Sequence, residues 1–180
     1  MFFKKQIDYE KILLKYVDSD FYLVACGKDA PSYDTLKIFE KKHSIKLPEE
    51  FKAFSVSPLG GIYIDIKDDI WPRPKPLEVG SFWSFLYGFA VFGFAIDISD
   101  WMNIENQANK FKEQTNNNYI PFMKVIGDSD LYCFDGKGLI YQWDHELDLF
   151  KKIDKSFNEL LEYEISELKL RKDRKVKSSS

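Results

Sequence analysis

Apolar and polar residues alternate in two different rhythms along the first third of the chain. Apolar side chains recur at helical spacing within residues 1–18, and this predicts an amphipathic helix. The short apolar run Phe21–Cys26 predicts a strand. Two further helices are predicted after it. One is capped by the hydroxyl of Ser32, and the other begins at Pro48 and ends before the pair Gly60–Gly61.

The middle of the chain is marked by strand alternation and by prolines. Every second position of residues 62–66 is isoleucine, which predicts a strand with one buried face. Residues 71–76 contain three prolines. Because proline fixes φ and removes a backbone donor, we expect a stiff exposed loop or an extended edge there.

An uncharged segment follows at residues 79–96. It has the length of a membrane span, but glycines and serines dilute it. Acidic residues, Glu78 and Asp97, flank it where a membrane anchor usually carries Lys or Arg. We therefore interpret the segment as a buried helix followed by an apolar strand.

The next region predicts a helix and then a β-meander. The helix is expected to be capped by Ser99 and to end at Asn116–Asn118. Its apolar side consists of Trp101, Ile104, Ala108 and Phe111. Three short apolar segments follow, at residues 120–126, 131–134 and 139–143, and turn residues join them, so they predict antiparallel strands.

A closing helix is predicted after Ser156, which suits an N-cap. Its apolar side consists of Phe157, Leu160, Leu161 and Ile165. Residues 167–180 are basic and are expected to form a solvated, frayed end.

These elements predict an α+β fold with one domain, in which helices flank a mixed, mostly antiparallel sheet. The length of 180 residues suits a single domain. We expect a helix-and-strand extension at residues 1–31, the main domain at residues 32–166, and the basic tail at residues 167–180.

Charge is spread unevenly over the chain. The formal net charge is -3, but residues 59–148 hold 7 Lys and Arg against 14 Asp and Glu, whereas residues 167–180 hold 6 against 2. An acidic middle repels phosphate, so it argues against a nucleic-acid surface there. It attracts a basic partner instead.

Cysteine and histidine are scarce, with two residues of each type. Residues this scarce favour neither a zinc cage built from Cys and His alone nor a disulfide scaffold. Cys26 and Cys133 lie far apart and form no CxxC motif, so we expect reduced thiols, a cytoplasmic protein, no membrane anchor and no cofactor.

No catalytic motif emerges. His43 is expected at a helix end and His145 in a polar turn, and neither has the partners of a catalytic triad. Asp128, Asp130 and Asp135 begin like a calcium loop, but that loop needs Gly at its sixth position and Glu at its twelfth. Cys133 and Leu139 stand there. A metal-dependent hydrolase that uses the three aspartates is thus a minor hypothesis beside ordinary Asp-rich turns, and we expect no enzyme and no metal.

Two segments mix aromatic and charged residues in a way that is typical of interfaces. We predict that they contact a protein partner, because Trp and Arg bring large contact area and acids steer association. The alternative is that both tryptophans are core residues and the acids solvate turns. The predicted contacts are Asp68, Asp69, Trp71, Arg73, Trp143, Asp144 and Glu146.

An ordered series of motifs resembles the SUKH superfamily, which includes yeast cell-wall synthesis regulators of the Smi/Knr type and many bacterial immunity proteins. The resemblance covers about residues 32–162. Its motifs are Phe39-Glu40, Ile45–Lys52, Gly60-Gly61, Tyr119–Phe122, Gly127, Tyr132–Asp135, Trp143–Glu146 and Ser156–Leu161.

The resemblance implies an α+β domain that binds without catalysis. It suggests an immunity protein that neutralises a cognate toxin, such as a nuclease or a deaminase. The alternative is a regulatory adaptor of the cell-wall regulator type, with no toxin partner.

Overall fold

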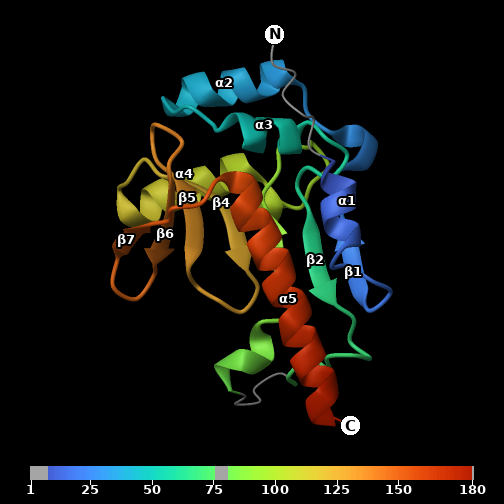
Figure 1. Cartoon of the computed structure of the whole chain (residues 1–180). Helices are drawn as coiled ribbons and strands as arrows, with labels where there is room; N and C mark the ends of the chain where they lie inside the picture. The colour runs from blue at the N-terminus through green and yellow to red at the C-terminus, as the bar shows by residue number, and fades with distance from the viewer. Residues whose placement is uncertain (1–7, 76–80, 180) are drawn as a thin grey trace.

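The computed structural model describes residues 8–75 and 81–179 (Figure 1). These residues form five α-helices, three short 3-10 turns and one seven-stranded sheet. The helices are α1 Tyr9–Leu14, α2 Tyr33–His43, α3 Glu49–Ser55, α4 Ile104–Thr115 and α5 Phe157–Ser179; the 3-10 turns are η1 Gly27–Asp29, η2 Phe82–Phe85 and η3 Asp100–Met102. The strands are β1 Phe21–Val24, β2 Tyr63–Ile66, β3 Gly88–Val91, β4 Ile120–Val125, β5 Leu131–Phe134, β6 Ile140–Asp144 and β7 Leu149–Lys152.

The sheet runs in chain order from β1 to β7, and each named strand is antiparallel to its neighbours. Because directions alternate, β2, β4 and β6 all end at the same side of the sheet, which we call the lower edge (Figure 1). The α+β single-domain fold is confirmed. The three-strand meander is also confirmed, within a sheet whose named pairs are antiparallel throughout.

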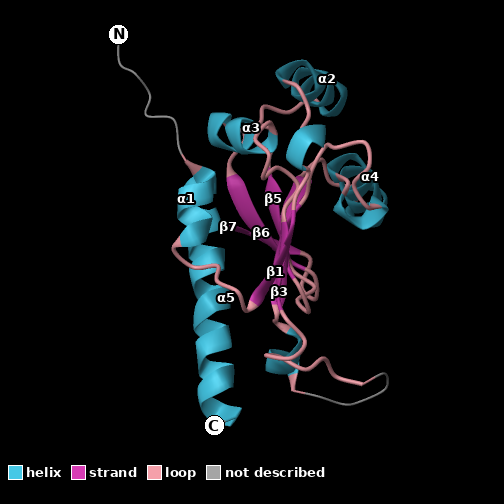
Figure 2. Ribbon diagram, turned by 90° about the vertical axis from the view of Figure 1, so that its right-hand side faces the viewer, coloured by secondary structure: helices cyan, strands magenta, loops and turns pink. Residues whose placement is uncertain are grey.

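Helices cover the sheet on both faces (Figure 2). α1 and α5 lie on one face, α4 lies on the other, and α2 and α3 close the upper end. The core beneath them is aromatic: the rings of Phe122 and Phe134 stack at 3.8 Å, and Phe51 meets both edge-on. The alternating isoleucines at 62, 64 and 66 are fully buried, as their spacing predicts.

Several caps follow the sequence. The Ser32 hydroxyl accepts from the Thr35 amide, and Ser156 and Glu159 form a reciprocal capping box at the start of α5. The cap of α4 is a correction, because Asn103 accepts the Asn106 amide at 3.1 Å while Ser99 starts η3. Trp101 thus lies before α4 and is exposed.

Two predicted segments differ in the structure, and one strand was missed. Within residues 1–18, the described helix is α1 alone, and residues 1–7 lie outside the described part. In residues 79–96 the described helical piece is the single turn η2, because glycines and serines leave few helix-stabilising contacts. β7 was not predicted; it is a mostly exposed edge strand whose two lysines hide its strand pattern.

The basic end of the chain departs most from expectation. α5 continues to Ser179, and both Leu168 and Lys172 are buried, so the prediction of a solvated, frayed end at residues 167–180 is wrong for this stretch. The spacing of Ile165, Leu168 and Lys172 continues the apolar side of the helix through the charged sequence. The proposed division of the chain at residues 31 and 166 stays a prediction.

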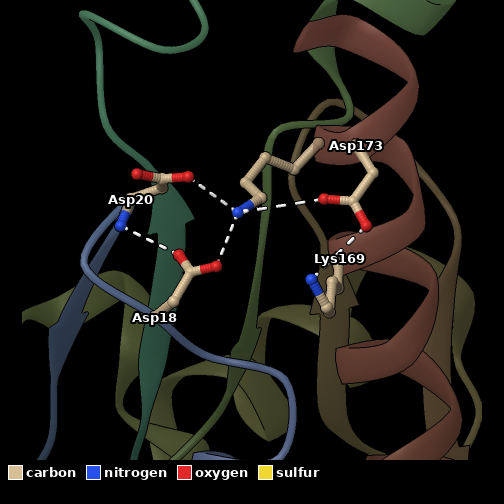
Figure 3. Close-up of polar contacts among 5 residues, drawn as sticks. Asp18, Asp20, Lys169 and Asp173 are labelled. Atoms are coloured by element: carbon tan, nitrogen blue, oxygen red, sulfur yellow. Dashed lines mark hydrogen bonds and ion pairs between the residues drawn. The ribbon is translucent and has the colours of Figure 1, made fainter. Parts of the chain in front are cut away.

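An ion cluster anchors this half of α5 to the approach to β1 (Figure 3). The Lys172 ammonium lies 2.7 Å from a carboxylate oxygen of Asp18 and 2.7 Å from one of Asp20. Asp173 lies on the helix side of the cluster and pairs with Lys169 at 3.3 Å (Figure 3). Because Lys172 is buried, two carboxylates are needed to offset its desolvation. The cluster therefore fixes where the end of α5 lies.

Candidate functional site

The lower edge of the sheet gathers acidic side chains from three loops. These loops follow β2, β4 and β6, which end there. We call this set the acidic edge, and its residues are Asp68, Asp69, Asp128, Asp130, Asp144, Glu146 and Asp148. β2 and β6 are four strand spacings apart, or about 19 Å. The middle loop, between β4 and β5, fills the interval.

Asp130 links two of these loops. Its carboxylate accepts the His145 amide at 3.1 Å and the Gln142 side-chain amide at 3.2 Å. The β4–β5 turn is thereby held against the β6–β7 turn. Partial burial raises the pKa of Asp130 above its ordinary value, and repulsion from Asp128 and Asp144 adds to the shift. Asp130 thus lies within the electrostatic reach of one carboxylate from each of the two turns.

The β6–β7 turn is built by its own acids. The Asp144 carboxylate accepts the backbone amides of Glu146 at 3.0 Å and Leu147 at 2.9 Å. The Asp148 carboxylate accepts the indole N–H of Trp143 at 2.8 Å. Glu146 is exposed, and so is Leu147. The turn thus presents negative charge beside an apolar side chain, on a rigid frame.

The first predicted segment divides into exposed acids and buried supports. Asp68 and Asp69 are exposed. Trp71 is only 5% exposed, and its indole donates to the Ser84 carbonyl at 3.1 Å. The Arg73 guanidinium is taken up within the fold, because it pairs with Asp65 at 2.9 Å and lies 3.7 Å above the Tyr87 ring. The expectation of a fully exposed loop at residues 71–76 is wrong at Trp71, and Pro76 lies outside the described residues.

The second predicted segment behaves in the same way. Asp144 and Glu146 lie on the acidic edge, whereas Trp143 is only 3% exposed and packs edge-on against Phe111. Both tryptophans are therefore core residues, the alternative considered from the sequence. Their contact with a partner stays a prediction. Because both rings are buried, they can support the exposed acids from beneath.

The aspartates of the metal hypothesis do not meet. Asp128 and Asp130 precede β5 at the lower edge, whereas Asp135 follows β5 at the upper end. Asp135 instead accepts the backbone amides of Lys137 and Leu139, both at 2.8 Å. Among residues 8–75 and 81–179, no group of three or more His, Cys, Asp or Glu side chains is arranged to hold a metal ion.

Sequence reasoning considered Asp128 and Asp130 as Asp-rich turn residues, with a metal site as a minor hypothesis, and overlooked Asp148. Strand direction was the available signal. In an antiparallel meander every second turn lies at the same edge, so the β4–β5 and β6–β7 turns had to meet. The cysteines are free; Cys133 is buried and Cys26 partly so, and burial raises the pKa of both thiols.

Within the described part of the chain, no helix combines the length and apolar character needed to cross a bilayer. No sequence among the curated proteins matches the chain. Residues 30–163 match the model of the SMI1 / KNR4 family (SUKH-1). This match covers most of the chain, including β2 to β7, α2 to α4 and the acidic edge. The chain therefore belongs to the SMI1 / KNR4 family (SUKH-1).

Proposed function

We propose that this chain is a non-catalytic protein-binding domain that acts as a bacterial immunity protein, neutralising a cognate basic toxin of the nuclease or deaminase kind in the cytoplasm. The observation that carries the proposal is the acidic edge. Three loops bring carboxylates to one side of the sheet, and two of these carboxylates, Asp128 and Asp144, also accept backbone amides of their own turns.

The arrangement suits recognition better than catalysis. Carboxylates that already accept two backbone amides, as Asp144 does, are fixed as turn supports. A basic effector carries a positive face for its nucleic acid, and an acidic edge attracts that face and speeds encounter. Trp71, Arg73 and Trp143 support this edge from beneath in the proposal.

The test begins with identification of the partner. The full chain is immobilised, a lysate of the native host is passed over it, and retained proteins are identified by mass spectrometry. The recovered partner is then expressed with and without this chain. Rescue of growth by the chain supports the immunity role. A partner that is not toxic contradicts it and favours the regulatory adaptor.

Charge reversal then tests the surface. The double variant Asp69→Lys and Glu146→Lys changes two exposed acids whose side chains accept no hydrogen bond within the described part of the chain, so we expect the fold to be preserved. We expect association with the partner to slow by about tenfold at low salt, with a weaker salt dependence. Glu113→Lys on α4 is the control for each charge change. Unchanged kinetics in the double variant would remove the acidic edge from the interface.

A further inference from the structure

A groove lies beside the acidic edge, between the C-terminal half of α5 and η2. Its volume is about 560 Å³. The residues that matter here are Trp71 and Trp83 on one wall and Arg171, Arg174 and Lys175 on the other. We call this hollow the α5–η2 groove. Three cations and one acid, Glu167, line it, so its charge is opposite to that of the acidic edge.

The groove has fixed walls. The Lys172 cluster described above anchors the helix on one side. On the other side, the indole of Trp71 donates to the Ser84 carbonyl, and this bond ties the proline segment to η2. The Lys175 ammonium lies 5.7 Å from the Trp71 ring centre. A preformed site of this kind binds with little loss of conformational entropy.

The rim of the groove exposes large aromatic rings. Trp83 is 70% exposed and its neighbour Phe82 is 49% exposed, with ring centres 5.7 Å apart. Exposed aromatic residues beside arginine are the composition of interface hot spots. The rim therefore offers an apolar contact next to the cationic wall.

The Arg171 guanidinium supplies an independent sign of a ligand. Its Nε and Nη2 atoms are buried, yet neither has a hydrogen-bond partner among the described residues. Buried donors without acceptors are costly. A carboxylate entering the groove accepts two parallel N–H bonds from a guanidinium, and so it removes that cost.

We propose that the α5–η2 groove binds a short acidic segment of a partner protein, with carboxylates at Arg171 and Arg174 and an apolar or aromatic side chain against Trp83. This surface is separate from the acidic edge, and the inference does not rest on the immunity role. A single-stranded nucleic acid also combines negative charge with stacking. It needs an extended basic track, whereas this groove offers three cations that all lie on the single helix α5.

The four tryptophans make a direct readout possible. The full chain is labelled with ¹⁵N and titrated with the blocked peptide Glu-Asp-Leu-Phe-Glu-Asp, and the four indole N–H signals are followed by NMR. We expect the signals of Trp71 and Trp83 to shift and those of Trp101 and Trp143, which lie outside the groove, to stay in place. A peptide with Lys in place of each acid should leave the signals of Trp71 and Trp83 in place. Equal shifts at all four indoles, or no shift, overturn the proposal.

A pair of variants tests the cationic wall. Arg174→Glu reverses an exposed charge in the groove, and Lys110→Glu makes the same charge change on α4. We expect the first to weaken peptide binding by at least about tenfold and the second by less than about twofold. Equal weakening by both overturns the specific site. Tighter binding of an octathymidylate than of the peptide, lost in Arg174→Glu, overturns the choice of an acidic peptide in favour of a nucleic acid.

Discussion

The acidic edge and the α5–η2 groove lie at the same end of the molecule but are built in opposite ways. The acidic edge consists of tight turns, in which Asp128 and Asp144 accept backbone amides two or three residues away. The groove depends on a long helix that is anchored to residues more than 150 positions earlier in the chain. Local turns fix one surface, whereas a distant side-chain cluster fixes the other.

The difference has a physical lesson about charge. Turn carboxylates stay partly solvated and accept N–H groups, so several of them can share one edge at modest cost. Buried cations have no such support. Lys172 therefore has two aspartates, and Arg171 keeps donors that no described residue satisfies. The turns of the acidic edge thus form without a further ligand, whereas the Arg171 guanidinium in the groove still lacks hydrogen-bond acceptors among the described residues.

The largest predicted effect compares one residue type in the two regions. Trp143→Ala removes a buried ring beneath the acidic edge, and we expect a loss of about 3–5 kcal/mol in the free energy of unfolding. Trp83→Ala removes an exposed ring at the groove, and we expect a change within about 0.5 kcal/mol. Urea unfolding followed by circular dichroism measures both. Similar losses in the two variants would contradict the different burial of the two rings.

A second prediction concerns the point where the two regions touch. Gly127, in the β4–β5 turn, has φ +84°, and a Cβ there would collide with the carbonyl of Phe85 in η2. Gly127→Ala should therefore cost about 2–3 kcal/mol of stability. Gly136→Ala is the control, because the φ of Gly136 is not positive and an added Cβ would lie 3.9 Å from its nearest neighbour, the Ser44 carbonyl oxygen. A cost for Gly136→Ala equal to that of Gly127→Ala would rule out close packing as the cause.

The third prediction loosens the groove alone. Lys172→Met keeps most of the side-chain volume but leaves Asp18 and Asp20 without their shared cation. We expect a loss of about 1–2 kcal/mol, below the value for a fully buried pair because both carboxylates are partly exposed. Lys169→Met, which removes an i,i+4 pair, should cost less than about 0.5 kcal/mol. Peptide binding should weaken in the first variant, while binding of a basic partner at the acidic edge should not change.

The smallest predicted effect is a pH dependence. Glu164 is a buried residue of α5, and burial raises its pKa above the ordinary value of 4.5 although Tyr132 donates to it at 2.7 Å. The folded state thus holds this proton more tightly than the unfolded state, so stability falls as the pH rises from the ordinary pKa through the raised one. Over that range of pH, the free energy of unfolding of Glu164→Gln should rise relative to that of the wild type.

Glu162→Gln provides a control of opposite sign on the same helix. Hydrogen bonds from Lys15 and Tyr16 lower the pKa of Glu162. The ionised form of Glu162 therefore stabilises the fold. The free energy of unfolding of Glu162→Gln should fall relative to that of the wild type as the pH rises. Denaturation midpoints at several pH values measure both differences. Parallel curves for the two variants would contradict these assignments.

The sequence predicted those parts of the molecule whose stability is local. The N-cap of α2, the Ser156 cap of α5 and the meander turns depend on neighbouring residues, so periodicity and turn chemistry identified them. The burial of Trp71 depends on η2 and that of Trp143 on α4. Neither element adjoins its tryptophan in sequence, so local composition could not decide between a core and an interface position. The basic end of α5 appeared solvated for the same reason, because its partners Asp18 and Asp20 lie at the other end of the sequence.

The chain-order sheet and its late anchor together set an order of assembly. Each strand of β1 to β7 pairs with the next strand in chain order. The whole sheet can therefore form while the ribosome still holds the residues that follow β7. The Lys172 cluster joins positions 152 and 154 residues apart, and it can close only after α5 has emerged. Until that moment a newly made molecule carries a finished acidic edge but lacks one wall of its groove.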